Sequence, residues 1–380
     1  MSIEWKTYKL GNICDYVTSR TTRIENYIST ENMLPNKGGV CAPSNVPSGT
    51  AIEYKVGDIL ISNIRPYFQK IWQADCNGAC SADVLCIRAN NKADSKYLYY
   101  LLSQQLFFDY VMAGAKGCKM PRGDKKQIMQ WQISLPSLEE QRRIAGILGA
   151  IDDKIENNRR INTNLELQAQ ALYKQWFVDF DFPNEEGKPY KSSGGKMVDS
   201  ELGPIPDGWR VQTFGDLIKP QKGKNITRAQ VTIGSVPVVA GGLMPSCYHN
   251  TSNTHCPVVT ISASGANAGY VKMYHMPIWA ADCSYIDDTI SKYVHFAYVF
   301  LTYNQTSIYH KQQGCAQPHI YPSHLMELQF ICPTLDILDK FESWSKKIYK
   351  LIGTNIQEIE TLATLRDTLL PKLMNGEIKL

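Results

Sequence analysis

Two helices with a coiled-coil repeat constrain the fold of this chain more than any other feature. From Pro136 to Phe177, apolar or small residues recur at steps that alternate between four and three. This spacing is typical of a coiled-coil seam, because a helix that packs on a globular core has a wider apolar face. Pro136 ends the preceding segment, and Ser137 with Glu140 predicts a capping box at the start of the helix.

The same repeat returns later, where each seam position follows its counterpart by 197 residues, as residue 341 follows residue 144. The main seam positions of the first helix are Ile144, Leu148, Ile151, Ile155, Asn158, Leu165, Leu172 and Trp176. Those of the second helix are Phe341, Ile348, Ile352, Asn355, Ile359, Leu362, Leu369 and Leu373. Two matching seams in one chain most simply pair with each other. Asn158 and Asn355 are equivalent and central, and because a buried Asn fixes register, we expect these two amides to meet, or nearly meet, close to the pseudo-two-fold axis.

The segments that precede the two seams also repeat each other. The matches are Trp5 with Trp209 at an offset of 204, Ile61-Ser62 with Ile261-Ser262 at 200, and Gly117-Cys118 with Gly314-Cys315 at 197. An offset that drifts and then stays constant indicates a duplication in which the globular part diverged while the helix kept its length. We therefore predict an internal duplication with pseudo-two-fold symmetry.

Composition and periodicity divide the chain into five segments. We predict a globular domain at 1–134, a seam helix at 135–180, a linker at 181–208, a second globular domain at 209–331 and a second seam helix at 332–380. In the first domain, short strands are expected at 56–62 and 81–88, and an aromatic-rich helix at 95–112. The linker is assigned from its many Pro, Gly, Ser and charged residues.

The order of these segments also predicts how the helices pair. Each globular domain leads into the N-terminal end of its own helix, so parallel pairing would crowd both domains at one end. Antiparallel pairing would separate them by about 50 Å over a seam from 144 to 176. The predicted fold class is α+β, with two mixed α/β globular domains at opposite ends of an antiparallel two-helix coiled coil.

Positive charge is concentrated in the two globular segments. Residues 1–134 carry 16 Lys and Arg against 11 Asp and Glu, and residues 209–331 carry 8 against 5. This distribution indicates that the globular segments face a polyanion. The N-terminal residues form no apolar signal core, and no apolar run is long enough to cross a bilayer. We therefore expect a cytoplasmic protein with reduced cysteines and no membrane association.

The sequence carries no catalytic constellation. An adenine methyltransferase needs an Asn/Asp-Pro-Pro-aromatic loop, and no Pro-Pro pair occurs. The Gly-rich segments lack the spacing of a phosphate loop, and the cysteines lack the paired short spacing of a structural zinc site. We therefore predict a protein that is not an enzyme and has no metal site.

Four segments resemble the specificity subunits of type I restriction-modification enzymes. They are LPSLEEQRRIA at 135–145, LYKQWFVDF at 172–180, GKPYKSSGG at 187–195 and LRDTLLPKLMNGEI at 365–378. The resemblance covers nearly the whole chain and includes the order globe, helix, globe, helix. The second copy departs from the family pattern at residues 333–339, where Thr334 alone remains as a helix cap.

The resemblance implies two target-recognition domains, each reading one half of a bipartite, asymmetric site on double-stranded DNA. It implies that the helical pair sets the gap between the halves and docks two adenine methyltransferase subunits, and that restriction motor-nuclease subunits join for cleavage. No cofactor is expected on this chain, because S-adenosylmethionine, ATP and Mg would be held by the partner subunits. A coiled-coil assembly scaffold, or the specificity subunit of a methylation-only system, remains an alternative.

Candidate DNA contacts are side chains that neutralise phosphates or pair with bases, since Arg and Lys suit phosphate and guanine while Asn and Gln suit adenine. In the first domain they are Arg65, Tyr67, Lys70, Lys116, Lys119, Arg122, Lys125 and Lys126. In the second domain they are Lys222, Lys224, Asn225, Arg228, Asn267, Lys272, Lys311, Gln312, Gln313, Gln317 and His319.

Overall fold

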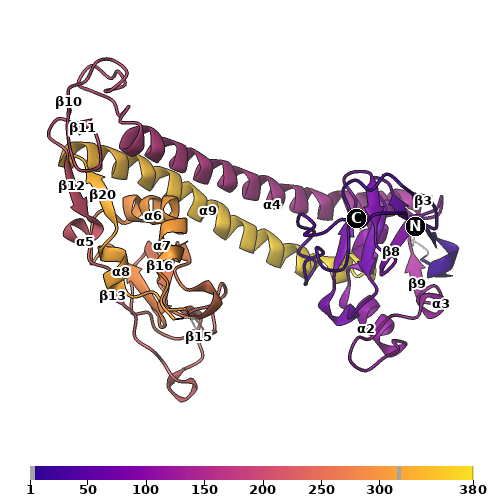
Figure 1. Cartoon of the computed structure of the whole chain (residues 1–380). Coiled ribbons are helices and arrows are strands. Elements are labelled where there is room, and N and C mark those ends of the chain that lie inside the picture. Colours follow the sequence, from indigo (N-terminus) through magenta and orange to yellow (C-terminus); the bar gives the residue numbers. More distant parts are fainter. Residues whose placement is uncertain (1–4, 315–317, 379) are drawn as a thin grey trace. The chain divides into compact units, whose positions relative to one another are not determined.

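The computed structural model describes residues 5–314, 318–378 and 380, so the candidate Gln317 lies outside the described residues. The chain forms two compact units. The N-terminal unit comprises residues 1–156 and 359–380, and the C-terminal unit comprises residues 157–358. The two long helices, α4 (Leu138–Tyr173) and α9 (Leu335–Met374), each contribute residues to both units (Figure 1). Helices and strands are mixed in both.

A four-stranded antiparallel sheet is the centre of the N-terminal unit. Its order is β2 (Cys14–Tyr16), β8 (Val84–Ala89), β5 (Ile59–Ser62) and β6 (Ile71–Gln73). A second sheet contains β3 (Arg20–Thr21), β4 (Ala51–Tyr54) and β7 (Gly78–Cys80), and β1 (Lys6–Lys9) pairs with β9 (Gln132–Leu135). The short helices are α1 (Ser95–Leu102), α2 (Gln105–Ala113) and α3 (Lys125–Ile128).

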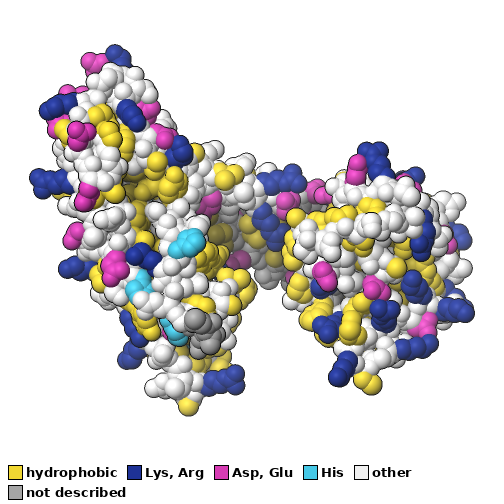
Figure 2. Space-filling model, viewed as in Figure 1, with side chains coloured by type: hydrophobic (Ala, Val, Ile, Leu, Met, Phe, Trp, Pro, Cys, Tyr) yellow, Lys and Arg dark blue, Asp and Glu magenta, His cyan; other side chains and the backbone are white. Residues whose placement is uncertain are grey.

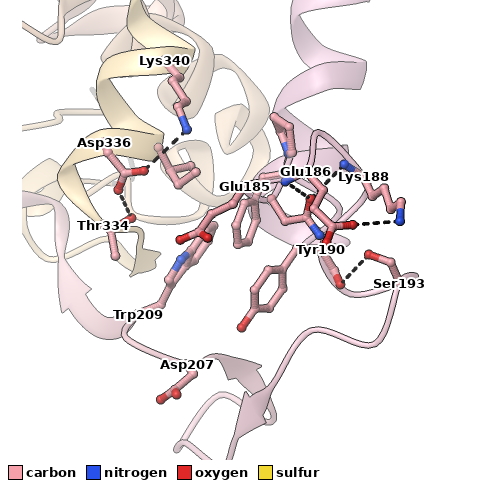
Figure 3. Close-up of a pocket in the computed structure, with 14 residues that line it drawn as sticks. Glu185, Glu186, Lys188, Tyr190, Ser193, Asp207, Trp209, Thr334, Asp336 and Lys340 are labelled. Atoms are coloured by element: carbon pink, nitrogen blue, oxygen red, sulfur yellow. Dashed lines mark hydrogen bonds and ion pairs between the residues drawn. The ribbon is translucent and has the colours of Figure 1, made fainter.

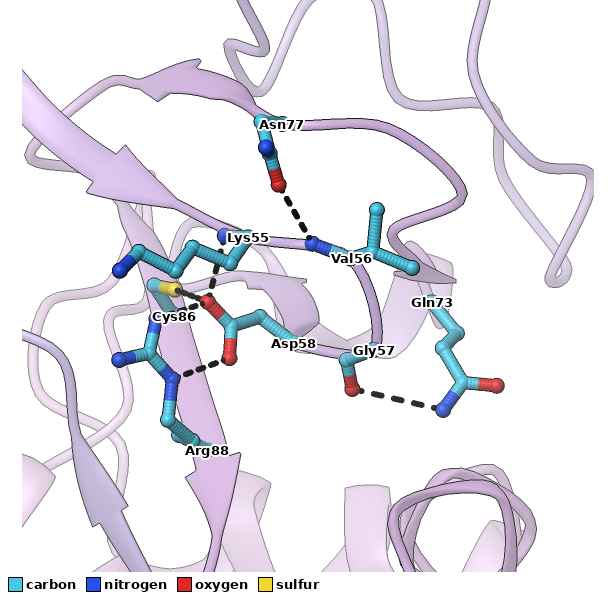
Figure 4. Close-up of polar contacts among 8 residues, drawn as sticks. All are labelled: Lys55, Val56, Gly57, Asp58, Gln73, Asn77, Cys86 and Arg88. Carbon is cyan, nitrogen blue, oxygen red and sulfur yellow. Dashed lines mark hydrogen bonds and ion pairs between the residues drawn. The ribbon is translucent and has the colours of Figure 1, made fainter.

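The predicted strands of this unit are present, but their ends differ from the prediction. β5 begins at Ile59 because the residues before it form a turn, in which Asp58 accepts the N–H of Lys55 at 2.8 Å. The same buried carboxylate accepts hydrogen bonds from Nε and Nη2 of Arg88 in β8, at 2.7 and 2.6 Å (Figure 4). The predicted helix at 95–112 is broken into α1 and α2 at Ser103, whose hydroxyl donates to the carbonyl of Tyr99.

The C-terminal unit repeats this arrangement. Its four-stranded sheet has the order β13 (Gln221–Lys222), β19 (Cys283–Ile286), β16 (Val258–Ser262) and β17 (Val271–Tyr274). The remaining strands are β10 (Met197–Val198), β11 (Ile205–Pro206), β12 (Arg210–Thr213), β14 (Val236–Val239), β15 (Cys247–His249), β18 (Trp279–Ala280) and β20 (Gln329–Cys332). The short helices are α5 (Phe214–Leu217), α6 (Val294–Tyr303), α7 (Gln305–His310) and α8 (Pro322–Met326).

Strand register confirms the internal duplication. In the N-terminal unit Ile59 lies opposite Ile87, and in the C-terminal unit Val259 lies opposite Ile286. The pair of β1 with β9 likewise has its counterpart in β12 with β20. The smaller sheets have diverged, because β4 and β7 are antiparallel whereas β14 and β18 are parallel. The two copies therefore share the strand pairing of the central sheet and differ in the smaller sheets around it.

The long helices run antiparallel within the N-terminal unit. Arg366 of α9 forms an ion pair with Asp152 of α4 at 2.8 Å. Leu373, which lies later in α9, shares a core cluster with Ile144 and Leu148, which lie earlier in α4. Residue numbers that rise on one helix and fall on the other define antiparallel packing. All seam positions of both helices are buried or half-buried.

The helices are also antiparallel within the C-terminal unit. The phenol of Tyr349 donates to Glu166 at 2.9 Å, and Phe341 contacts the rings of Tyr173 and Trp176. Burial raises the pKa of the Glu166 carboxyl, while its bonds to two tyrosine hydroxyls oppose that rise. α4 is followed by a π turn over Lys174–Val178 that places two successive aromatic rings in the core.

Asn158 and Asn355 do not bond to each other, and each bonds to a side chain about one helical turn from the other Asn. Asn158 donates to Glu358 at 2.7 Å, and Asn355 donates to Asn162 at 2.7 Å. The physical reason is an asymmetry between the copies. At the offset of 197, the counterpart of Asn162 is Ile359, which offers no side-chain acceptor. Asn355 therefore finds an amide partner, and Asn158 bonds to a carboxylate.

The segment 181–208, predicted to be a linker, is folded onto the C-terminal unit. Phe182 is stacked between two other rings, with its ring centroid 4.6 Å from that of Tyr190 and 4.8 Å from that of Trp209. β10 and β11 pair within the same segment. The composition suited a linker, but these aromatic side chains bury enough apolar area to order the backbone.

Helix capping differs in part from the expected pattern. The N–H of Glu140 donates to the Ser137 hydroxyl at 3.3 Å, as expected for a capping box. The carboxylate of Glu140, however, accepts the N–H of Leu380 and Nη1 of Arg143. Among the helices in the described part of the chain, none is sufficiently long and apolar to span a membrane.

A carboxylate that is 12% exposed couples α9 to α6, and its removal tests the core of the C-terminal unit. Glu342 accepts hydrogen bonds from the Nδ1 of His295 at 2.6 Å and from the N–H of Phe296 at 2.9 Å. We predict that Glu342→Ala lowers the free energy of unfolding by about 2–4 kcal/mol, because buried donors lose a charged acceptor. The control Asp339→Ala removes an exposed ion pair with Lys292 and should change stability little. Thermal and denaturant unfolding of both variants measure the difference, and equal losses would contradict the prediction.

Candidate nucleic-acid interface

Two loops of the N-terminal unit are joined into one surface at the edge of the central sheet. The first, residues 63–70, connects β5 to β6, and the second, residues 114–124, connects α2 to α3. The N–H of Arg65 donates to the carbonyl of Pro121 at 2.8 Å, and Lys116 and Arg122 exchange two backbone hydrogen bonds at 2.9 Å. We call these residues the N-terminal loop pair. Its backbone is held by its own hydrogen bonds, so its shape does not require a ligand.

The C-terminal unit has an equivalent surface, the C-terminal loop pair, formed by residues 263–270 and the described part of 311–320. The N–H of Gly265 donates to the carbonyl of Pro318 at 3.0 Å, and Gln313 and His319 exchange backbone hydrogen bonds at 3.1 and 2.8 Å. Each bond is the counterpart of one in the N-terminal loop pair at the offsets found in the sequence. The duplication has therefore kept the backbone of this surface while replacing its side chains.

Most of the predicted contacts of the first domain come together on the N-terminal loop pair. Six charged candidates are exposed on the loop pair or at the adjoining start of α3: Arg65, Lys116, Lys119, Arg122, Lys125 and Lys126. Two of them also pair locally, because Lys116 lies 2.8 Å from Asp124 and Arg122 lies 3.2 Å from Asp83. The Lys116 ammonium and the backbone N–H groups of α3 hold the pKa of Asp124 at about 2, so this carboxylate is ionised at neutral pH.

The remaining two candidates of this domain differ in orientation. Tyr67 is exposed beside Phe68, with ring centroids 4.7 Å apart, on the 3-10 turn at the tip of the first loop. The ammonium of Lys70, in contrast, donates to the carbonyl of Thr30 at 2.7 Å. Lys70 therefore ties the loop to a neighbouring segment.

Several candidates of the second domain also have structural partners. The amide of Gln312 donates to the carbonyl of Ala268 at 2.8 Å, and that of Asn267 donates to the carbonyl of Gly241 at 3.4 Å. Lys272 donates to the carbonyl of Leu243 and lies over the ring of Tyr274, and its burial lowers its pKa. These contacts hold the loops together.

The other candidates of this domain leave side chains available at the surface. Gln313 is exposed, His319 is half-buried with its ring stacked on Tyr321, and Lys311 lies 3.6 Å from Glu327. Exposed basic and amide side chains also lie at the end of β13 and in the segment after it, namely Lys222, Lys224, Asn225 and Arg228. The N–H of Gly223 donates to Cys283 and that of Ala263 donates to Asp282, so this segment lies at the same sheet edge as the loop pair.

The structure adds residues that the sequence analysis missed. Phe68 is 37% exposed on the N-terminal loop pair, and Leu243 and Met244 are 49% and 75% exposed on the loop joined to Asn267. The sequence could have indicated that Phe68 is exposed, because two adjacent aromatic residues follow Pro66 there. The apolar pair had no signal, because its place beside the C-terminal loop pair depends on tertiary hydrogen bonds.

The surface of both units matches a polyanionic ligand better than a small molecule. Figure 2 shows Lys and Arg side chains across the visible face of each unit, with Asp and Glu more sparsely placed on the N-terminal one. Such a distribution attracts phosphates through charge and leaves base contacts to individual side chains.

A cavity of about 510 Å³ in the C-terminal unit offers no catalytic arrangement. Its lining includes Glu186 paired with Lys188, and Asp336 bonded to Thr334 and Lys340 (Figure 3). These bonds lower the pKa of Asp336, with the Thr334 hydroxyl as the largest cause. None of the lining residues is His or Cys. Within the described residues, no group of three His, Cys, Asp or Glu side chains is placed to hold a metal ion.

Comparisons with known proteins agree with these features. Residues 2–167 match the family model described as type I restriction modification DNA specificity domain. The chain is 28% identical to the type I restriction enzyme MjaIX specificity subunit of Methanocaldococcus jannaschii, over 75% of this chain and 69% of that protein. It is 25% identical to the HindI specificity subunit of Haemophilus influenzae, over 99% of this chain and 100% of that protein.

Among solved structures, the S subunit of a type I restriction-modification system from M. genitalium has a similar fold. The TM-score is 0.59 at 18% identity, covering 98% of this chain and 96% of that one. The likeness extends along both chains, so it includes both copies of the duplication. The resemblance to type I specificity subunits inferred from sequence motifs is confirmed.

The exposed lysines of α3 allow a test of phosphate contact. We predict that replacing Lys125 and Lys126 by Ala weakens binding to all DNA sequences alike and lowers the slope of log K against log salt by about one per lysine. The control is Lys92→Ala, an exposed lysine beside the start of α4. Fluorescence anisotropy of the full chain on duplex DNA at several salt concentrations measures the slopes. An unchanged slope in the double variant would exclude α3 from the interface.

Proposed function

We infer that this chain is the DNA specificity subunit of a type I restriction-modification enzyme and reads a bipartite, asymmetric site on double-stranded DNA. The single observation that carries this proposal is the presence of two equivalent loop pairs on a duplicated fold. Both have the same backbone hydrogen bonds, and both expose basic or amide side chains at the edge of a central sheet. A protein that reads two half-sites needs two such surfaces.

The difference between the loop pairs supports an asymmetric target. The N-terminal loop pair exposes mainly Arg and Lys, whereas the C-terminal one carries Gln313 and His319 and is flanked by Asn225. Arginine pairs with guanine and amides pair with adenine in the major groove. Two copies of one fold with different side chains would therefore read different half-sites.

The proposal also assigns spacing to the helices. Antiparallel contacts between α4 and α9 occur within each unit, as the pairs Asp152–Arg366 and Asn162–Asn355 illustrate. Such contacts support a continuous antiparallel two-helix coiled coil with one target-recognition domain at each end. The length of the seam would then set the gap between the half-sites.

The partner subunits follow from the same proposal. Two adenine methyltransferase subunits would dock on the helical pair, and motor-nuclease subunits would join for restriction. S-adenosylmethionine, ATP and Mg would be held by those subunits. This chain would supply position and specificity, which accords with a cavity in which Glu186 pairs with Lys188 and Asp336 with Lys340.

The first test is the methylome of cells that carry the complete system. We predict methylated adenines, one on each strand, in a motif of two defined halves around a fixed gap. Deleting only the gene for this chain should abolish that methylation, because the methyltransferase would lose its target specificity. A continuous motif, or methylation that persists after deletion, would refute the proposal.

The second test separates reading from spacing. We predict that one heptad inserted after Glu156 in α4 and one after Glu358 in α9 lengthens the gap by about three base pairs, since seven helical residues rise about 10.5 Å. Both half-sites should stay the same, because the loop pairs are unchanged. The control inserts a heptad in α4 alone, which should disrupt the seam and abolish methylation. Altered half-sites with an unchanged gap would show that the helices do not set the spacing.

A further inference from the structure

We propose that Arg65 reads a guanine in the half-site bound by the N-terminal unit, an inference that rests on the proposed function. The observation behind it is the backbone of Arg65, which has φ 51° and ψ 61°. This is the left-handed region, which is unfavourable for residues with a Cβ and is usually occupied by Gly, Asn or Asp. An arginine at such a position calls for an explanation.

The second copy shows that the turn itself does not need an arginine. Gly265 is the counterpart of Arg65, with φ 78° and the equivalent backbone hydrogen bond to a loop proline. A Cβ added at Gly265 would meet no atom within 4 Å, so steric crowding does not explain the glycine there. The same turn is thus built with the favourable residue in one copy and with an unfavourable one in the other.

A neighbouring residue shows what a structural explanation would look like. Gln69 is also left-handed, with φ 50°, and its counterpart is Gly269. The side-chain amide of Gln69 donates to the side-chain oxygen of Gln105 at the start of α2, and this contact offsets the unfavourable backbone. The side chain of Arg65 is exposed and has no hydrogen bond or ion pair with any described residue. The Arg65 side chain therefore does not stabilise the fold, and the reason for an arginine at this position is a contact with another molecule.

A contact between the Arg65 side chain and a base explains the unfavourable backbone better than a contact with a phosphate does. Other exposed basic side chains of the N-terminal loop pair and of the adjoining α3 can neutralise phosphates from favourable backbone positions, and these are Lys116, Lys119, Arg122, Lys125 and Lys126. Only a contact that depends on direction requires one particular backbone position. The guanidinium group is a planar fork of donors that matches N7 and O6 of guanine.

The backbone of Arg65 is fixed as such a contact requires. Its N–H donates to the carbonyl of Pro121 at 2.8 Å, and its carbonyl accepts the N–H of Phe68 at 3.0 Å. Both main-chain groups are thus held by the N-terminal loop pair. A guanidinium on a fixed backbone loses less freedom on binding, which favours discrimination between bases.

The experiment replaces Arg65 by the residue that the second copy uses. In cells that carry the complete system, Arg65→Gly should make one base pair of one half-site degenerate and leave the other half-site and the gap unchanged. In competition binding by the full complex, discrimination at that base pair should fall by about 10- to 100-fold. The purified full chain should not lose stability, and we expect its Tm to rise by about 2–4 °C because glycine fits the backbone.

The control is Asn26→Gly, which also places glycine at a left-handed position but lies outside the N-terminal loop pair. It should leave the methylated motif unchanged. A motif that is unchanged in Arg65→Gly, or binding that weakens equally on all sequences, would overturn the proposal in favour of no contact or a phosphate contact. A lower Tm for Arg65→Gly would also overturn it, because the arginine would then serve the fold. The wild-type motif tests the proposed function separately, since that function fails if the wild-type motif is not bipartite.

Discussion

The packing of α4 against α9 is the constraint on which the rest of this structure depends. The core of the N-terminal unit includes Leu370 and Leu373 from the second copy, beside Ile144 and Leu148 from the first. The core of the C-terminal unit includes Ala169 and Tyr173 from the first copy. Each unit is therefore completed by a helix segment that the other copy supplies. Neither copy can bury its own seam alone, so the two seams must match in length and period, which is why the offset of 197 does not drift.

Features that depend on period and repetition could be predicted from the sequence, whereas features that depend on single tertiary contacts could not. The seams and the duplication were visible because many positions carry each signal. The exact partner of Asn158 depends on one difference between the copies, Asn162 against Ile359, which the seam period does not reveal. The segment 181–208 was assigned by composition, which gives little weight to a few aromatic residues such as Phe182.

The same reasoning explains which candidate DNA contacts could be recognised. A charged or amide side chain in a loop has the same appearance in sequence whether it faces solvent or a carbonyl. Lys70, Lys272 and Gln312 each donate to a backbone carbonyl that is distant in the sequence. No local sequence pattern predicts such a partner. The basic cluster around Lys125 was easier to predict, because consecutive charges at the start of a short helix have little room to be buried.

The loop pairs show how recognition can diverge while the fold is kept. Their shape is set by main-chain hydrogen bonds, which any residue except proline can donate, so side chains are free to change without loss of the turn. The limit to this freedom is the left-handed backbone at the first position of the turn, where most side chains are disfavoured. Glycine adopts this backbone without strain but has no side chain that could contact DNA, as at Gly265. Arg65 has the same backbone conformation although it is unfavourable for arginine, and this conformation holds its guanidinium group at a fixed place. Because stability and recognition compete at this position, a residue that is costly to the fold is the one most informative about function.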